Sequence, residues 1–194
     1  MRRIAKKTFV YGAGTWALQN TTRYKYREWN PIEETVADAS GAITAVKRYV
    51  WGNDLNGNMD GAGGVGGLLS MSRLTSGATV PDNFFYAYDG NGNVRALVKA
   101  DAANPAASAI VKRYAYDGFG RELAGTTPLT TSVNGFRFST KMSDGESGMN
   151  YYGYRYYAAE NGRWINRDPI AEKGGLNVYA MIENNVIYLS IQMV

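Results

Sequence analysis

The chain of 194 residues contains no cysteine and no histidine. Without histidine, neither a Ser-His-Asp triad nor a Cys-His nucleophile can be assembled. The usual cysteine and histidine ligands of zinc are missing too, so we expect no metal site and no cofactor. Because no disulfide can form, the cysteine content does not distinguish an oxidising from a reducing compartment.

Long apolar runs are also missing, and no stretch approaches the roughly 20 apolar residues of a membrane helix, so no membrane span is expected. The basic residues 2–7 are similar to the start of a signal peptide, but Gly12 and Gly14 interrupt the short apolar run behind them. We therefore expect a strand there, and no signal peptide in this chain.

The net charge of +4 is unevenly distributed. Residues 1–50 contain nine Lys or Arg and four Asp or Glu, a balance of 9 − 4 = +5, and the remainder sums to −1. A basic arm can bind nucleic acid, but no nucleic-acid-binding motif accompanies this charge. A solvated strand face is the favoured interpretation, and nucleic acid is not an expected partner.

Tyrosine and glycine are abundant, with 15 and 23 copies. Five aromatic pairs share an i, i+2 spacing: Tyr24 and Tyr26, Tyr49 and Trp51, Tyr86 and Tyr88, Tyr114 and Tyr116, and Phe136 and Phe138. In a strand, residues i and i+2 point to the same face, so each pair places two rings on one side of a sheet. Pairs on neighbouring strands would form an aromatic ladder of cross-strand contacts.

Tight-turn sequences follow two of these pairs directly. Residues 89–93 are Asp-Gly-Asn-Gly-Asn, and residues 117–121 are Asp-Gly-Phe-Gly-Arg. Asp-Gly and Asn-Gly favour hairpin turns, in which the aspartate side chain can accept backbone N–H groups. The pattern predicts an all-β fold of consecutive antiparallel hairpins in a twisted, partly curled open sheet, with a small irregular C-terminal core plug. Short helices are expected only near residues 157–162 and 175–183.

The Gly- and Asn-rich segment 52–67 interrupts the hairpin pattern and is expected to be an extended loop. Its residues 61–66 match GxGxxG literally, but neither a helix start nor the acidic residue of a dinucleotide site follows. Residues 54–61 resemble a calcium loop that lacks the glycine and glutamate of an EF-hand. Turn chemistry of Asn and Asp is the favoured interpretation, with a weak surface cation site as the alternative.

Two ordered sets of motifs indicate a family. The first set is Tyr-Ala-Tyr-Asp-Gly-Asn-Gly-Asn at 86–93 and Tyr-Ala-Tyr-Asp-Gly-Phe-Gly-Arg at 114–121, which resembles the YD repeats of RHS proteins. The second set is Phe-Arg-Phe-Ser-Thr-Lys at 136–141, Gly-Met-Asn-Tyr-Tyr-Gly-Tyr-Arg-Tyr-Tyr at 148–157, Gly-Arg-Trp at 162–164, Arg-Asp-Pro-Ile at 167–170 and Gly-Gly-Leu-Asn-Val-Tyr at 174–179. This succession resembles the RHS repeat-associated core domain.

The resemblance implies two regions: a YD-repeat hairpin array over residues 1–135, and an RHS repeat-associated core domain over residues 136–194 that is truncated at its C-terminus. Relatives of this kind coil a long sheet of hairpins into a hollow shell around a C-terminal toxin, and the core domain closes one end. The implied partners are other RHS shell segments or a toxin cargo, and the implied location is secreted or cell-surface.

The resemblance also implies a catalytic motif for aspartyl autoproteolysis. In the family, the Asp of Arg-Asp-Pro-Ile pairs with a second Asp in a downstream Asp-Pro-x-Gly-Leu motif. Arg167 and Asp168 match the first motif, but Ser190, 22 residues after Asp168, stands where the second Asp is expected. Two close carboxylates share one proton, so that one acts as base and the other as acid. With Ser190 in the partner position we expect no self-cleavage, and Glu172 or Glu183 is the alternative partner.

Three functions remain open on the sequence. The first is a non-enzymatic structural fragment of an RHS-type, polymorphic-toxin-like shell with a degenerate autoproteolytic core. The second is an aspartyl self-cleaving core that releases a C-terminal toxin. The third is a carbohydrate or cell-surface binding module that uses rings such as Tyr86 and Tyr114. Arg155 is expected to pack on rings or pair with a carboxylate, and Trp164 to anchor the core.

Overall fold

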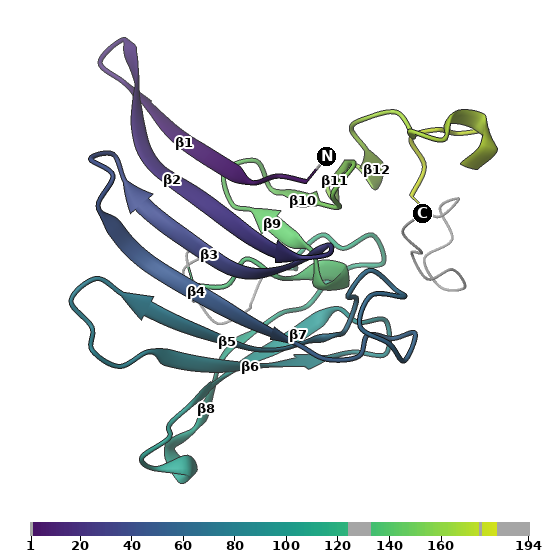
Figure 1. Ribbon diagram of the computed structural model, residues 1–194. Coiled ribbons are helices and arrows are strands. Elements are labelled where there is room, and N and C mark those ends of the chain that lie inside the picture. The colour runs from purple at the N-terminus through teal and green to yellow at the C-terminus, as the bar shows by residue number, and fades with distance from the viewer. Residues whose placement is uncertain (1, 124–132, 175, 182–194) are drawn as a thin grey trace.

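A computed structural model describes residues 2–123, 133–174 and 176–181 of the chain (Figure 1). The strands are β1 (Ala5–Gly12), β2 (Thr15–Arg27), β3 (Asn30–Asp38), β4 (Ile43–Trp51), β5 (Leu68–Thr75), β6 (Asp82–Tyr88), β7 (Val94–Ala100), β8 (Ala109–Arg113), β9 (Met142–Asp144), β10 (Met149–Tyr151), β11 (Tyr156–Ala158) and β12 (Arg163–Trp164). The helical turns are η1 (Pro105–Ala107), η2 (Phe138–Thr140) and η3 (Ala171–Gly174). None of the described helices has the length and apolar character needed to cross a membrane.

The strands β1 to β8 form one sheet whose spatial order follows the sequence, and every neighbouring pair is antiparallel. A second sheet has the order β12-β11-β10-β9. Figure 1 shows the larger sheet curving around the segment that follows β8. The expected all-β fold of consecutive hairpins in an open, curled sheet is therefore confirmed.

Three hairpin turns share one hydrogen-bonding pattern, centred on Asp38, Asp89 and Asp117. In each turn, the aspartate Oδ1 accepts the backbone N–H groups of the second and fourth residues after it, at 2.9–3.0 Å. The third residue after it is a glycine with φ between 72° and 91°, a region that glycine adopts at little steric cost. The expected role of Asp89 and Asp117 as acceptors for backbone N–H groups is confirmed, and Asp38 closes a third turn of the same kind.

All ten rings of the i, i+2 pairs lie in or against the hydrophobic core. The Tyr24 and Tyr26 rings, for example, are 6.3 Å apart between centroids. The pairs of the large sheet lie on β2, β4 and β6, so they occupy every second strand rather than neighbouring ones. A hairpin carries its pair on one of its two strands only, and apolar residues such as Met71 on β5 and Leu97 on β7 lie between successive pairs.

The segment after β8 packs against the inner face of the large sheet. Val133, Phe136, Met142 and Tyr151 belong to the same buried cluster as the rings of β2 and β4. The Phe136 ring meets the rings of Tyr49 and Trp51 edge-on, at 5.1 and 5.6 Å. Such edge-to-face pairs add to the free energy of apolar burial, so this segment is held by the same rings that build the sheet.

The N-terminal strand is joined to the same segment by a charged network. Arg3 Nη1 donates to Asp144 Oδ2 at 2.6 Å, and Lys6 Nζ lies 3.2 Å from Asp144 Oδ1. The Arg3 guanidinium also lies 4.5 Å from the Tyr151 ring centroid. The beginning of the chain and the segment around β9 and β10 are thus packed together, although about 140 residues of sequence separate them.

The prediction of a helix at residues 157–162 is wrong. Residues 156–158 form β11, which pairs with β12, and a turn follows through Gly162 at φ 63°. Tyr157 is fully buried and pairs with Trp164, so tertiary packing overrides the local helix propensity of the two alanines and the glutamate that follow. Of the second expected helix, residues 176–181 form turns and a bridge instead, and positions 175, 182 and 183 lie outside the described residues.

Candidate functional site

Asp168 lies in the turn between β12 and η3, and each of its carboxylate oxygens accepts a hydrogen bond. Oδ2 accepts a hydrogen bond from Arg155 Nη1 at 2.5 Å, and Oδ1 accepts the backbone N–H of Ile170 at 3.0 Å. The Asp168 backbone N–H donates to Val178 O, and its carbonyl accepts the N–H of Ala171, both at 3.0 Å. The aspartate therefore fixes this turn through both its side chain and its backbone.

Arg155 combines the two roles expected for it. Its guanidinium carbon lies 4.1 Å from the Trp164 ring centroid, and the same guanidinium pairs with Asp168. Trp164 is buried, with its ring 4.9 Å from that of Tyr152 and 5.4 Å from that of Tyr157. Both the packing of Arg155 and the anchoring role of Trp164 are confirmed.

Among the described residues, neither the Arg167 nor the Glu172 side chain forms a hydrogen bond or an ion pair with Asp168. Arg167 is exposed, and within the described ranges its side chain forms no ion pair, so Arg155 is the cation of this carboxylate. Glu172 is exposed in η3. Ser190 and Glu183 lie outside the described residues. The described part of the site contains one carboxylate held by a cation, whereas an aspartyl dyad needs two carboxylates in contact.

The loop 52–67 connects β4 to β5 and folds around Asp54. The Asp54 carboxylate accepts the backbone N–H groups of Asn56, Ala62 and Gly64 at 2.9, 2.6 and 3.1 Å. These amides occupy the oxygens that a cation would need, which favours turn chemistry over a cation site. A strand, β5, follows this loop where a dinucleotide-binding motif requires a helix.

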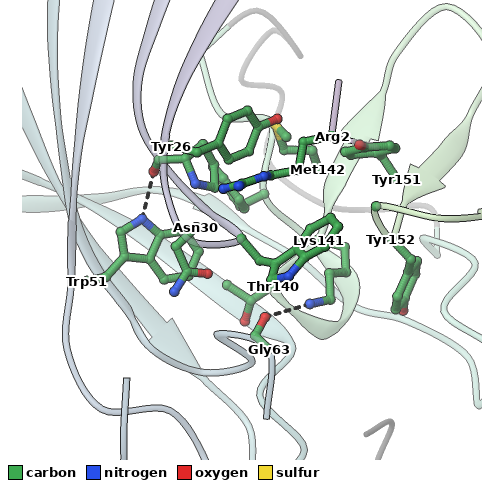
Figure 2. Close-up of a pocket in the computed structure, with 14 residues that line it drawn as sticks. Arg2, Tyr26, Asn30, Trp51, Gly63, Thr140, Lys141, Met142, Tyr151 and Tyr152 are labelled. Carbon is green, nitrogen blue, oxygen red and sulfur yellow. Dashed lines mark hydrogen bonds between the residues drawn. The ribbon is translucent and has the colours of Figure 1, made fainter. Parts of the chain in front are cut away.

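A small cavity lies where this loop meets the segment around η2 (Figure 2). Its accessible volume is about 40 Å³, and it is lined by Arg2, Tyr26, Trp29, Asn30, Pro31, Trp51, Gly63, Phe136, Thr140, Lys141, Met142, Tyr151, Tyr152 and Gly153. Figure 2 shows Lys141 extended toward Gly63. The Lys141 Nζ donates to Gly63 O at 2.7 Å and lies 5.6 Å from the Tyr152 ring centroid.

Lys141 is buried, with a relative exposure of 7%. Burial lowers the pKa of its ammonium from the usual 10.5 to about 8, and the field of Asp54 opposes this shift. The sequence around Lys141 does not mark it as a functional residue. Its partner Gly63 lies 78 residues earlier in the chain, so no local pattern indicates that the lysine is buried.

The rings proposed for carbohydrate binding face the core instead. Tyr114 is buried, and Tyr86 is half-buried against the same cluster. Tyr86 Oη donates to Asn134 Oδ1 at 3.0 Å, and Asn134 Nδ2 donates to Tyr114 Oη at 3.0 Å. Rings that stack on sugars need an open face, which these two rings lack.

Comparisons with known proteins agree with this architecture. No family model matches the chain. It is 39% identical over 67 residues to toxin subunit YenC2 of Yersinia entomophaga, covering 34% of this chain and 7% of that protein. It is 46% identical over 48 residues to toxin protein Tse5 of Pseudomonas aeruginosa, covering 25% of this chain and 4% of that protein. The chain therefore spans less than a tenth of these relatives.

Among solved structures, the crystal structure of TcdB2-TccC3 has the same fold, with a TM-score of 0.68 at 22% identity. The match covers 98% of this chain and 8% of that one. The likeness runs through both sheets rather than one motif, because nearly every residue is aligned. The Asp-centred turns, the aromatic pairs, the fold and the toxin relatives together identify the chain as an RHS-type protein.

Proposed function

We propose that this chain is a non-enzymatic wall segment of an RHS-type toxin shell. The observation that carries this proposal is that the repeated motif residues serve packing and turns. The aromatic pairs build the core, the repeated aspartates close hairpins, and the aspartate of the core motif fixes a turn through an arginine. On this proposal the partners are flanking shell segments and a toxin cargo.

The proposal includes a core that has lost self-cleavage. Peptide hydrolysis by an aspartyl pair needs one carboxylate as base and one as acid. Asp168 is paired with the permanently charged guanidinium of Arg155, and the partner position is Ser190, whose hydroxyl cannot take the place of a carboxylate. We therefore expect the purified chain to keep its full mass indefinitely.

Intact-mass measurements over several days at pH 4 to 8 test this expectation. Ser190→Asp restores the second carboxylate, and Asp168→Asn is the matched control in both backgrounds. A single mass throughout supports the proposal. A discrete cut near residue 190 in the unmodified chain, abolished by Asp168→Asn, would overturn it in favour of the self-cleaving alternative.

The shell role has its own test. Residues 2–181 are grafted into TcdB2-TccC3 in place of the segment to which they align, and the chimera is expressed and purified. A wall segment should leave the chimera folded and able to form the complex seen for TcdB2-TccC3. Aggregation of the chimera, while this chain remains folded in isolation, would argue that its sheet edges do not join shell strands.

A further inference from the structure

Lys141 is a buried cation whose hydrogen-bonding capacity is not met by the protein. A lysine ammonium has three N–H donors, and among the described residues Lys141 has one oxygen acceptor, Gly63 O at 2.7 Å, and one ring, that of Tyr152. No ion pair forms at Lys141 within that part of the chain. Buried charges are normally paired or fully hydrogen-bonded, because burying an unpaired charge is strongly unfavourable.

Among the described residues, Asp54 forms no ion pair with Lys141 and does not supply the missing acceptors. The field of Asp54 favours the charged form of Lys141, but the oxygens of Asp54 are taken up by three backbone amides of its own loop. The remaining donors of Lys141 therefore need acceptors that the described residues do not supply.

The cavity beside Lys141 has the size of one small polar group. Its accessible volume is about 40 Å³, and a single water requires roughly 10–15 Å³ on this measure. The space therefore accommodates about three water-sized atoms, which is the size of a carboxylate group. Its walls include the aromatic side chains of Trp51, Phe136 and Tyr152.

A second cation lies at the open side of the cavity. Arg2 is the only exposed residue among those that line it. Its guanidinium carbon lies 5.4 Å from the Trp29 ring centroid and 5.8 Å from that of Tyr26. This stacking holds the guanidinium at the rim, and its N–H groups form no hydrogen bond with the described part of the chain, since the ring faces accept no conventional hydrogen bond.

We propose that this cavity binds one carboxylate group between the Lys141 ammonium and the Arg2 guanidinium. A carboxylate provides two oxygens with about four acceptor positions, enough to meet the remaining donors of Lys141 and one edge of Arg2. It also neutralises the buried charge. The carboxylate belongs either to a free small acid or to a peptide that reaches the rim past Arg2.

Sodium formate is the probe, because it is the smallest carboxylate. Binding is followed by NMR on the full chain labelled with ¹³C at the lysine ε position, with the Lys141 signal assigned from Lys141→Met. We expect a saturable shift of the Lys141 signal with formate and none with sodium chloride at equal ionic strength. Because the ammonium is the binding form, the apparent affinity should fall about tenfold per pH unit above pH 8.

Two variants and two peptides complete the test. Lys141→Met fills the same space and should fold, because apolar replacements of buried charges are usually tolerated. Formate then gives no saturable shift of the neighbouring Tyr152 ring signals. Arg2→Gln, at an exposed position, should weaken formate binding about tenfold. A short glycine peptide with a free C-terminus, compared with its amide, distinguishes a peptide source from a free acid.

Either source of carboxylate supports the proposal, provided that Lys141 is required. A response that does not saturate, an equal response to chloride, or unchanged formate binding in Lys141→Met would overturn it. In those cases the cavity holds water alone.

Discussion

Arg155 Nη1 lies 2.5 Å from Oδ2 of Asp168, so the aspartate of the core motif is held by an arginine 13 residues earlier rather than by its sequence neighbour Arg167. The same guanidinium covers the Trp164 ring. The pair connects the residue directly before β11 to the turn after β12, which gives Asp168 a structural role in the segment that contains the smaller sheet.

The first prediction concerns the strength of this pair. Arg155→Met and Asp168→Asn should each lower the free energy of unfolding by about 1 kcal/mol, because both side chains are partly exposed and salt screens them. A double-mutant cycle from urea denaturation should give a coupling of about 0.5–1 kcal/mol that shrinks at high salt. A coupling of zero would mean that the pair contributes nothing to folding.

Ala171 provides a second prediction from the same turn. It adopts φ 53° and donates its N–H to Asp168 O, the position that glycine takes in the turns after Asp38, Asp89 and Asp117. The left-handed conformation costs an alanine about 1–2 kcal/mol, partly offset by the entropy that glycine gains in the unfolded chain. Ala171→Gly should therefore raise the free energy of unfolding by about 0.5–1 kcal/mol.

The control for this change is Ala17→Gly, at an exposed position in β2. There the backbone is extended, so glycine brings only its entropic cost and should destabilise by about 0.5–1 kcal/mol. Thermal and urea unfolding of both variants measure the difference. Destabilisation by both substitutions would contradict the assigned backbone conformation of Ala171.

The parts of this fold that the sequence could predict are local. The i, i+2 rings indicated strands, and the turns after Tyr88 and Tyr116 were predictable because a single Asp side chain closes a five-residue turn within its own segment. The order of the large sheet follows from these units, since consecutive hairpins pair with their neighbours.

The parts that escaped prediction depend on distant residues. The burial of Lys141 requires Gly63 to reach it from the loop between β4 and β5. Likewise, Asp168 pairs with Arg155, which directly precedes β11 and lies against the Trp164 ring of β12. The sequence allowed Arg155 to pair with a carboxylate without indicating which one. Where a side chain has several candidate partners, only the packed structure selects one.

A third prediction tests the Asp-centred turns. Asp89→Ala removes the acceptor of two backbone N–H groups, each worth about 1 kcal/mol net, so the free energy of unfolding should fall by about 2 kcal/mol. Asp89→Asn keeps a side-chain oxygen at the same position and should lose less than half as much. Urea denaturation distinguishes the two, and equal losses would show that the carboxylate charge matters more than its geometry.

A fourth prediction concerns the contact between the N-terminus and the plug. The Arg3 and Asp144 side chains are only 9% and 11% exposed. Removing one member of a buried ion pair leaves the charge of the other buried without a partner. Arg3→Met and Asp144→Asn should each destabilise the chain by about 3 kcal/mol, with strongly non-additive effects in the double variant. Hydrogen exchange should show faster opening of β9 and β10 in the single variants. Unchanged exchange there would contradict the role of Arg3 in holding the plug.

The last prediction is the pH dependence of stability. Lys141 has a pKa of about 8 in the folded chain and its usual 10.5 when unfolded, so between these values the unfolded chain binds more protons. The free energy of unfolding should therefore rise with pH over this window, by up to about 3 kcal/mol. Buried tyrosines such as Tyr24 and Tyr152 act in the opposite sense, because burial raises the pKa of their hydroxyls. Below pH 10 these tyrosines are neutral in both the folded and the unfolded chain. Above pH 10 the tyrosines of the unfolded chain ionise first, which favours unfolding.

Stability should consequently pass through a maximum between about pH 9 and pH 10.5. The Lys141→Met variant isolates the two contributions, because it should lose the rise above pH 8 and keep the fall above pH 10. Urea denaturation followed by tryptophan fluorescence from pH 7 to 11 measures both limbs. If the free energy of unfolding of Lys141→Met rises with pH at the same slope, the rise belongs to another titrating group, since methionine has no proton to release.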